Sequence, residues 1–146
     1  MTNEVQEPVS AAFAMRLHMP HPYPCVLVTT FLHYSQRDPY AVRMTFRLSA
    51  GDEPVVWNIG RDLLRDGLIR LTGEGAVQIS PDPTESNTIF IRLQVDDDSA
   101  ILMAQRQPVI AFLQRSAEVV PYGREMAVAG VQTRLDTELA RILASS

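Results

Sequence analysis

Hydrophobic and polar residues alternate with a period of two through the first half of the chain. In residues 11–19 (AAFAMRLHM), Phe13, Met15 and Leu17 fall on one side of an extended chain. Arg16 and His18 fall on the other side, as is typical of an antiparallel strand with one buried face. Segments rich in β-branched, aromatic and other apolar residues predict further strands at 25–34, 40–49, 54–59, 76–80, 88–95 and 100–105. The pattern therefore predicts about seven short strands.

The spacing of apolar residues becomes helical after residue 107. Pro108 suits the first turn of a helix, and apolar residues recur at helical spacing after it, which predicts a helix over 108–120. The segment Pro121-Tyr122-Gly123 predicts its end. A second helix is predicted over roughly 131–144 by the stripe Val131, Leu135, Leu139 and Ile142. Strands followed by helices indicate an α+β domain with a mostly antiparallel sheet.

Residues 60–68 (GRDLLRDGL) place several charges beside leucines. A short helical turn over 61–65 explains this composition, because Asp62 would lie near the positive N-terminal end and Arg65 near the negative C-terminal end. Gly67 is then expected in the left-handed conformation that ends many helices, with Leu68 packing back on Leu63. Two alternatives stay open, namely an Asp-Arg pair in an active site and a surface that another protein recognises.

Composition and charge restrict the class of protein. The chain has 146 residues, of which 46% are hydrophobic and 21% charged, and this fits a single globular domain. We place that domain at residues 11–146, after a mobile N-terminal tail at residues 1–10. The formal net charge is −4, and all 13 basic residues are arginines that occur singly along the chain. The sequence therefore lacks the basic run expected of a nucleic-acid-binding protein.

The sequence also lacks signals for secretion or membrane insertion. The N-terminal segment MTNEVQEPVS is acidic and has neither the basic start nor the apolar stretch of a secretory signal. No apolar stretch approaches the ~20 residues that span a bilayer. The single cysteine, Cys25, cannot form an internal disulfide, and its apolar neighbours predict a buried thiol. We expect a cytoplasmic protein without direct transmembrane insertion.

No group of residues predicts catalysis or metal binding. His18, His21, Cys25 and His33 are of the types that bind zinc. Prolines extend the chain between His18 and Cys25, however, and on a strand His18 and His21 would face opposite ways. The run Asp96 to Asp98 lacks the spaced oxygen ligands of a calcium loop and predicts a solvated turn. We therefore expect no catalytic residues, no cofactor and no bound metal.

Four segments of the chain resemble the SsgA-like proteins of actinomycetes, a family that controls sporulation and cell division. They are RDPYAVRMTF (37–46), VVWNIGRDLLRDGL (55–68), the segment from Gly73 to Pro81, and FLQRSAEVVPYGRE (112–125). Their order and spacing are similar to the family over roughly residues 11–125. The C-terminal LDTELARILASS is similar to the end of the SsgB-type branch. The exclusive use of arginine also fits a high-GC actinomycete genome.

This resemblance implies a non-enzymatic regulator. Such a protein would help to position and assemble the tubulin-like division protein FtsZ at the division septum, together with other SsgA-like proteins and membrane-associated division proteins. The family also resembles the whirly and mitochondrial guide-RNA-binding proteins, which implies their fold and a homotrimer. That second likeness supplies an alternative function, a module that binds single-stranded nucleic acid. The acidic net charge opposes the alternative.

Seven residues are candidates for protein binding. We expect Glu125 to be exposed in a loop between two helices, at a position that the family pattern keeps acidic, with capping of the last helix as its alternative role. Trp57 suits an interface anchor, although tryptophan more often lies in a core or a subunit interface. The other candidates are Arg61, Asp62 and Leu64 in the helical turn, and Asp38 and Tyr40, which alternatively only shape a hairpin.

Overall fold

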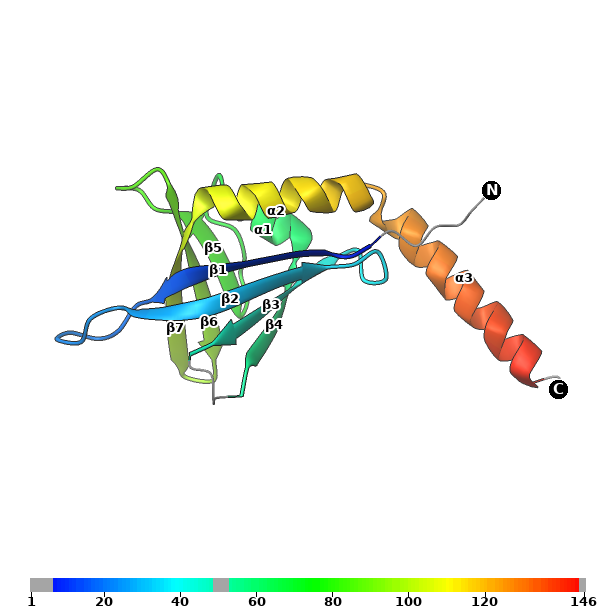
Figure 1. Cartoon of the computed structure of the whole chain (residues 1–146), viewed down its shortest axis with the longest axis horizontal. Helices are drawn as coiled ribbons and strands as arrows, with labels where there is room; N and C mark the ends of the chain where they lie inside the picture. The colour runs from blue at the N-terminus through cyan, green and yellow to red at the C-terminus, as the bar shows by residue number, and fades with distance from the viewer. Residues whose placement is uncertain (1–6, 49–52, 145–146) are drawn as a thin grey trace.

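The strands form one seven-stranded sheet in the order β4-β3-β2-β1-β7-β6-β5 (Figure 1). The structure is a computed structural model that describes residues 7–48 and 53–144, and residues 129–136 are described by their backbone alone. The strands are β1 (Val9–Leu17), β2 (Val26–Tyr34), β3 (Ala41–Arg47), β4 (Val55–Gly60), β5 (Val77–Pro81), β6 (Thr88–Val95) and β7 (Asp98–Gln105). All neighbouring strands in the sheet are antiparallel. The predicted α+β class with a seven-stranded antiparallel sheet is confirmed.

The first strand begins earlier than the predicted start of the domain at residue 11. Val9 is buried and pairs with Tyr34 of β2, and Ser10 pairs with His33. Residues 9 and 10 therefore belong to the sheet and not to the predicted tail. The first six residues of that tail lie outside the described part of the chain.

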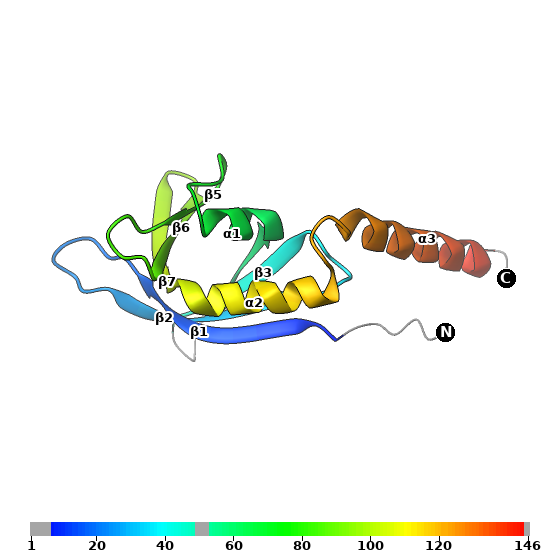
Figure 2. The same cartoon turned by 90° about the horizontal axis from the view of Figure 1, so that it is seen from above.

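The sheet consists of two meanders that share a short contact. Strands β1 to β4 pair in sequence order, and strands β5 to β7 do the same. Between these halves, β1 and β7 share only the pairs Arg16 with Met103 and Leu17 with Leu102. The β5–β7 half therefore turns across the β1–β4 half (Figures 1 and 2). Both halves present their apolar faces, here called the inner face, to one core.

Two helices cover the inner face at one end of the sheet. They are α1 (Arg61–Gly67) and α2 (Arg106–Val119), which lie beside one another (Figure 2). Leu64 of α1 and Phe112 of α2 are fully buried among inward strand residues such as Met44 and Ile91. The predicted helix at 108–120 thus exists and begins two residues earlier, at Arg106.

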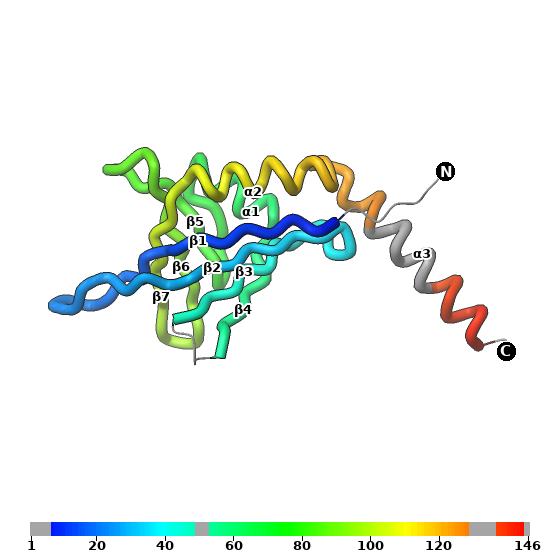
Figure 3. Tube along the Cα trace, viewed as in Figure 1, coloured from blue at the N-terminus to red at the C-terminus, as the bar shows by residue number. Residues whose placement is uncertain are grey.

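A third helix, α3 (Glu125–Ala144), runs away from the sheet (Figures 1 and 3). It begins six residues before the predicted start at 131, because Gly123 makes the turn with a φ of 90° and Glu125 already suits the positive end of a helix. The side chains of Val131 and Leu135 lie outside the described residues. The remaining members of the predicted stripe, Leu139 and Ile142, are exposed.

Gly67 is the last residue of α1, and glycine is needed there for a different reason than the predicted one. The described glycines with positive φ are Gly73 and Gly123, and Leu68 after the helix has a right-handed conformation. The left-handed end predicted at Gly67 is therefore wrong. A β-carbon at Gly67 would instead overlap the side chain of Ile79 in β5. The chain needs glycine here because α1 packs closely against this strand.

The substitution Gly67→Ala is expected to destabilise the fold by about 1–3 kcal/mol, because the added methyl group overpacks the contact between α1 and β5. Gly75→Ala is the matched control, since a β-carbon there meets no atom within 4 Å. Its effect should stay within about 0.5 kcal/mol. Urea unfolding followed by circular dichroism measures both variants. Equal free energies of unfolding would contradict the proposed role of Gly67.

Candidate functional site

Arg61 lies buried where three helices meet. It is the first residue of α1 and is 0% exposed. Its Nη1 donates hydrogen bonds to the carbonyl oxygens of Val120 at 2.6 Å and Ser116 at 3.3 Å, both at the end of α2. A cation in this place complements the negative end of the α2 dipole. Arg61 thereby joins the start of α1 to the end of α2.

Glu125 pairs with Arg61 from the first turn of α3. The Arg61 Nη2 donates to Oε1 at 2.7 Å, and Oε2 accepts from the backbone N–H of Gly123 at 2.8 Å. The hydrogen bond from Arg61 is the main cause that lowers the pKa of the Glu125 carboxyl below its ordinary value. Because folding lowers this pKa, the ionised carboxylate stabilises the fold, and the contribution is lost as the pH falls through the lowered pKa.

Two tyrosine rings enclose the Arg61 guanidinium. Its Cζ lies 4.7 Å from the centroid of the Tyr34 ring and 4.2 Å from that of Tyr122, within the range of a cation–π interaction. Tyr34 comes from β2, and its hydroxyl donates to the carbonyl oxygen of Pro39 at 2.9 Å. Burial raises the pKa of Tyr34 to about 12, so this phenol is neutral at ordinary pH. The cluster therefore ties all three helices to β2.

Three of the predicted protein-binding residues are buried by this arrangement. Glu125 is 7% exposed, and Arg61 and Leu64 are 0% exposed. The expectation that Glu125 is exposed is wrong, because a buried cation 64 residues earlier in the chain takes its carboxylate as a partner. Arg61 and Leu64 are inaccessible as well, because the inward side of α1 packs on the core.

Asp62, Asp38 and Tyr40 remain accessible. The Asp62 side chain is 65% exposed and lies 3.7 Å from Arg65 in the same helix. Tyr40 is 50% exposed, and Asp38 is exposed in the turn between β2 and β3. The carbonyl oxygen of Asp38 accepts from the Ala41 N–H and thereby shapes the hairpin. The carbonyl oxygen of Tyr40 accepts from the Arg61 N–H and thereby positions α1. The predicted hairpin role is confirmed, and protein binding by these three residues stays a prediction.

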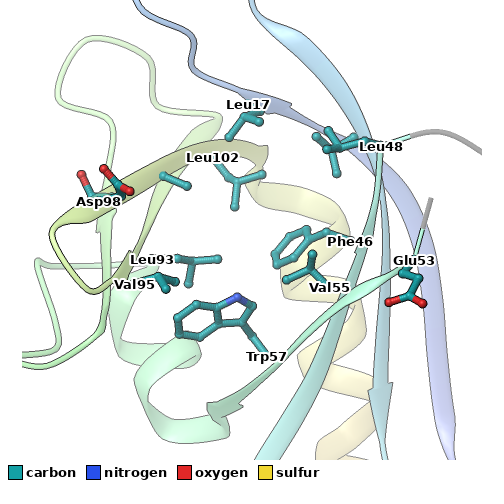
Figure 4. Close-up of a pocket in the computed structure, with 13 residues that line it drawn as sticks. Leu17, Phe46, Leu48, Glu53, Val55, Trp57, Leu93, Val95, Asp98 and Leu102 are labelled. Atoms are coloured by element: carbon teal, nitrogen blue, oxygen red, sulfur yellow. The ribbon is translucent and has the colours of Figure 1, made fainter.

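Trp57 lines an apolar pocket of about 290 Å³ at the end of the inner face that the helices leave uncovered (Figure 4). The half-buried indole comes from β4 and faces Leu93 and Val95 of β6, across the core (Figure 4). The carboxylates of Glu53 and Asp98 lie at opposite sides of the pocket (Figure 4). The lining residues are Leu17, Val28, Phe46, Leu48, Glu53, Val55, Trp57, Leu93, Val95, Asp98, Ser99, Ala100 and Leu102.

Three large apolar side chains at this pocket reach the surface. Leu48 is 55% exposed, Val55 is 53% exposed and Val95 is 57% exposed. Contiguous exposed apolar residues of this kind commonly mark a protein-binding site. Tryptophan is also the side chain most favoured as an interface anchor. The pocket around Trp57 is therefore the candidate functional site, and of the seven predicted residues it contains Trp57.

The neighbours of Trp57 in the pocket are not among the seven residues predicted from the sequence. Leu48 and Val55 flank residues 51–54 (GDEP), a composition typical of a turn, and Val95 precedes the acidic run at 96–98. An apolar residue next to a turn signal is a hint of surface exposure. That hint does not show that the three residues lie around one pocket, because this depends on how the β1–β4 half of the sheet is oriented relative to the β5–β7 half.

Other candidate residues do not gather into a chemical site. Within residues 7–48 and 53–144, no three His, Cys, Asp or Glu side chains are placed to hold a metal ion. Cys25 is exposed, so the predicted buried thiol is wrong, and the reason is that its neighbours Val26 and Leu27 are themselves exposed. Asp96 and Asp97 form the predicted turn between β6 and β7. No helix of the described chain has the length and apolarity to cross a bilayer.

Comparison with known proteins finds one family. Residues 28–125 match the family model described as the Streptomyces sporulation and cell division protein SsgA. The sporulation-specific cell division protein SsgB of Frankia casuarinae is 35% identical over 136 residues, which cover 92% of this chain and 91% of that protein. The SsgB protein of Kineococcus radiotolerans is 41% identical over 105 residues, which cover 70% of this chain but only 62% of that protein.

A solved structure agrees with these sequence matches. It is the crystal structure of an SsgA-like sporulation-specific cell division protein from Thermobifida fusca, with a TM-score of 0.85 and 32% identity. The match covers 94% of this chain and 99% of that one. It therefore includes the sheet and the helices, whereas the expected likeness to whirly proteins stays a prediction.

Removing the carboxylate in Glu125→Ala is expected to cost about 3 kcal/mol of stability, because it leaves the Arg61 charge buried without its partner. The double variant Arg61→Met with Glu125→Leu should lose less than the sum of the single losses. Glu138→Ala is the control, since it breaks the exposed pair with Arg141 and should cost at most about 0.5 kcal/mol. Chemical denaturation measures these three variants together with the single variants Arg61→Met and Glu125→Leu, and additive losses in the double variant would contradict the coupling.

Proposed function

The chain belongs to the family of the Streptomyces sporulation and cell division protein SsgA, and from this premise we propose that it is a non-enzymatic adaptor that helps to position and assemble FtsZ at septum sites. The observation that carries the proposal is the apolar pocket around Trp57. An adaptor needs an accessible surface that another protein can desolvate. This pocket supplies an aromatic anchor with exposed aliphatic neighbours.

The chemistry of the pocket supports protein binding in preference to catalysis. Its lining is apolar except for Ser99 and the two carboxylates of Glu53 and Asp98. A catalytic site needs polar groups that converge on one reacting atom, and apolar side chains supply none. An apolar hollow with acidic residues at its sides suits instead an apolar side chain of a partner protein, with a basic residue next to it in the partner's sequence.

The projecting helix α3 supports a second part of the proposal, a homotrimer built through this helix. Met126 is 77% exposed and Leu139 is 57% exposed on a helix that extends beyond the sheet (Figure 1). An amphipathic helix buries its apolar face against another element in most globular proteins. A second copy of the chain would provide such an element. Repetition of the Trp57 pocket in three copies would then raise the avidity for an FtsZ polymer.

The substitution Val55→Asp is expected to weaken the effect of the protein on FtsZ polymers at least tenfold, on the order of a lost interface hot spot, because it places a charge in the apolar surface where a side chain of the partner would pack. The unaltered chain should increase the amount of FtsZ that sediments with GTP. Ile69→Asp is the matched control, since Ile69 is 67% exposed outside the pocket. Unchanged sedimentation with the unaltered chain, or equal losses in both variants, would contradict the proposed function.

Light scattering is expected to give a mass three times the chain mass of 16.3 kDa at micromolar concentration. Leu139→Glu should shift the protein toward the monomer, because it places a charge in the apolar part of α3. Glu138→Gln, at the adjacent exposed position, should leave the mass unchanged. A monomeric mass for the unaltered chain would contradict trimer formation.

A further inference from the structure

On the face of the sheet turned away from α1 and α2, here called the outer face, the charged strand residues are all of one sign, although Asp82 and Glu85 of the connection between β5 and β6 share a hollow with Arg16. Strand alternation and the pairing registers place four arginines on it: Arg16 in β1, Arg43 and Arg47 in β3, and Arg92 in β6. No outward position of the seven described strands is occupied by Asp or Glu. The outer face is therefore basic although the chain as a whole is acidic, with a net charge of −4.

Two of these arginines flank an apolar row. Phe31 of β2, Thr45 of β3 and Val56 of β4 are register partners across the sheet. Phe31 is 42% exposed and Val56 is 51% exposed. Arg43 and Arg47 lie two residues before and after Thr45 on the same strand, which puts their Cα atoms about 13 Å apart. The result is an exposed apolar row with one cation on each side.

The arginines are available for a ligand. The salt bridges found in the described chain use Arg61, Arg65 and Arg141, and none uses Arg43 or Arg47. Asp38 shares a shallow hollow with Arg43 and His33, but no salt bridge joins it to Arg43 within the described residues. Arg47 lies at the other end of β3 from this carboxylate.

We propose that the outer face binds an acidic, extended protein segment that runs along β3. In an extended segment, residues i, i+2 and i+4 face the same way, and i and i+4 are about 13 Å apart. Carboxylates at i and i+4 thus match the spacing of Arg43 and Arg47, and an apolar residue at i+2 falls on the row of Phe31 and Val56. A guanidinium pairs with a carboxylate through two parallel hydrogen bonds.

Composition favours a protein segment over nucleic acid at this face. Arginine and aromatic residues are enriched at protein interfaces, and Lys, Glu and Asp are depleted. The outer strand positions follow this composition, with arginines and Phe31 and without Glu or Asp. A long polyanion would additionally meet the acidic remainder of the protein. The outer face lies on the opposite side of the sheet from the Trp57 pocket. Binding of an acidic segment at the outer face is therefore independent of binding at the pocket, and each is tested separately.

Fluorescence anisotropy with a labelled peptide that contains Glu-Ser-Leu-Ser-Glu tests the proposal. The peptide should bind the full-length chain at about 50 mM salt and weaken as salt rises. Arg43→Glu and Arg47→Glu should each reduce the affinity at least about tenfold, as expected for a lost charge-assisted contact. Arg70→Glu is the matched control, because Arg70 is exposed in the turn after α1, and its affinity should be unchanged.

Additional controls distinguish binding through Arg43 and Arg47 from misfolding of the variants and from binding of nucleic acid. Circular dichroism checks that each variant is folded. If charge reversal unfolds the chain, Arg43→Gln and Arg47→Gln replace the Glu variants, and we expect them to lose less affinity for the peptide. A peptide with Gln in place of Glu should not bind. Absence of binding by the acidic peptide, or binding that Arg43 and Arg47 do not affect, would overturn the proposal. Tighter binding of a 20-nucleotide thymidine strand through the same arginines would overturn it in favour of nucleic acid.

Discussion

The buried guanidinium of Arg61 is the interaction on which the arrangement of the helices depends. A cation without solvent is costly unless charges and hydrogen-bond acceptors surround it. Here the carbonyl oxygens of Ser116 and Val120, the carboxylate of Glu125 and two tyrosine rings supply them. Ser116 and Val120 lie at the end of α2, Glu125 begins α3, Tyr34 ends β2, and Tyr122 lies in the turn between α2 and α3. One cation thus fixes where α2 ends, where α3 begins and how both lie on β2, although its Nε has no hydrogen-bond partner among the described residues.

The short pairing between β1 and β7 determines which parts of the sheet are accessible to other molecules. Two residue pairs and the hydrogen bond from the His18 N–H to the Ile101 carbonyl oxygen join the halves of the sheet, so one half turns across the other. The inner face then closes on α1 and α2 at one end and leaves the Trp57 pocket at the other. The outer face stays uncovered by the helices and carries Arg43 and Arg47 beside Phe31. The two faces of the sheet thus differ in chemistry, since one has an apolar pocket with acidic sides and the other carries arginines on its strands.

Local patterns predict the elements well and their contacts poorly. The strands follow from alternation because one face of each is buried and the other is not. Gly67 could be predicted near the end of α1, but the need for glycine there comes from close packing on Ile79, which lies twelve positions away in sequence. Trp57 could be predicted as an anchor from its residue type alone. The sequence predicts Glu125 at the surface because it follows the loop-forming segment Pro121-Tyr122-Gly123, and local composition contains no information about a cation in another helix.

The sequence by itself determined the strand and helix segments, the turns, the acidic net charge and the family, because these properties depend on residues close together in the chain or on the order of short motifs. Only the tertiary structure decided that Arg61 and Glu125 form a buried pair, that Leu48, Val55 and Val95 meet around Trp57, and that Phe31 and Val56 lie beside the strand that carries Arg43 and Arg47. The physical reason is that burial and pairing are properties of distant segments brought together. A residue's own neighbours in sequence do not specify which segments those will be.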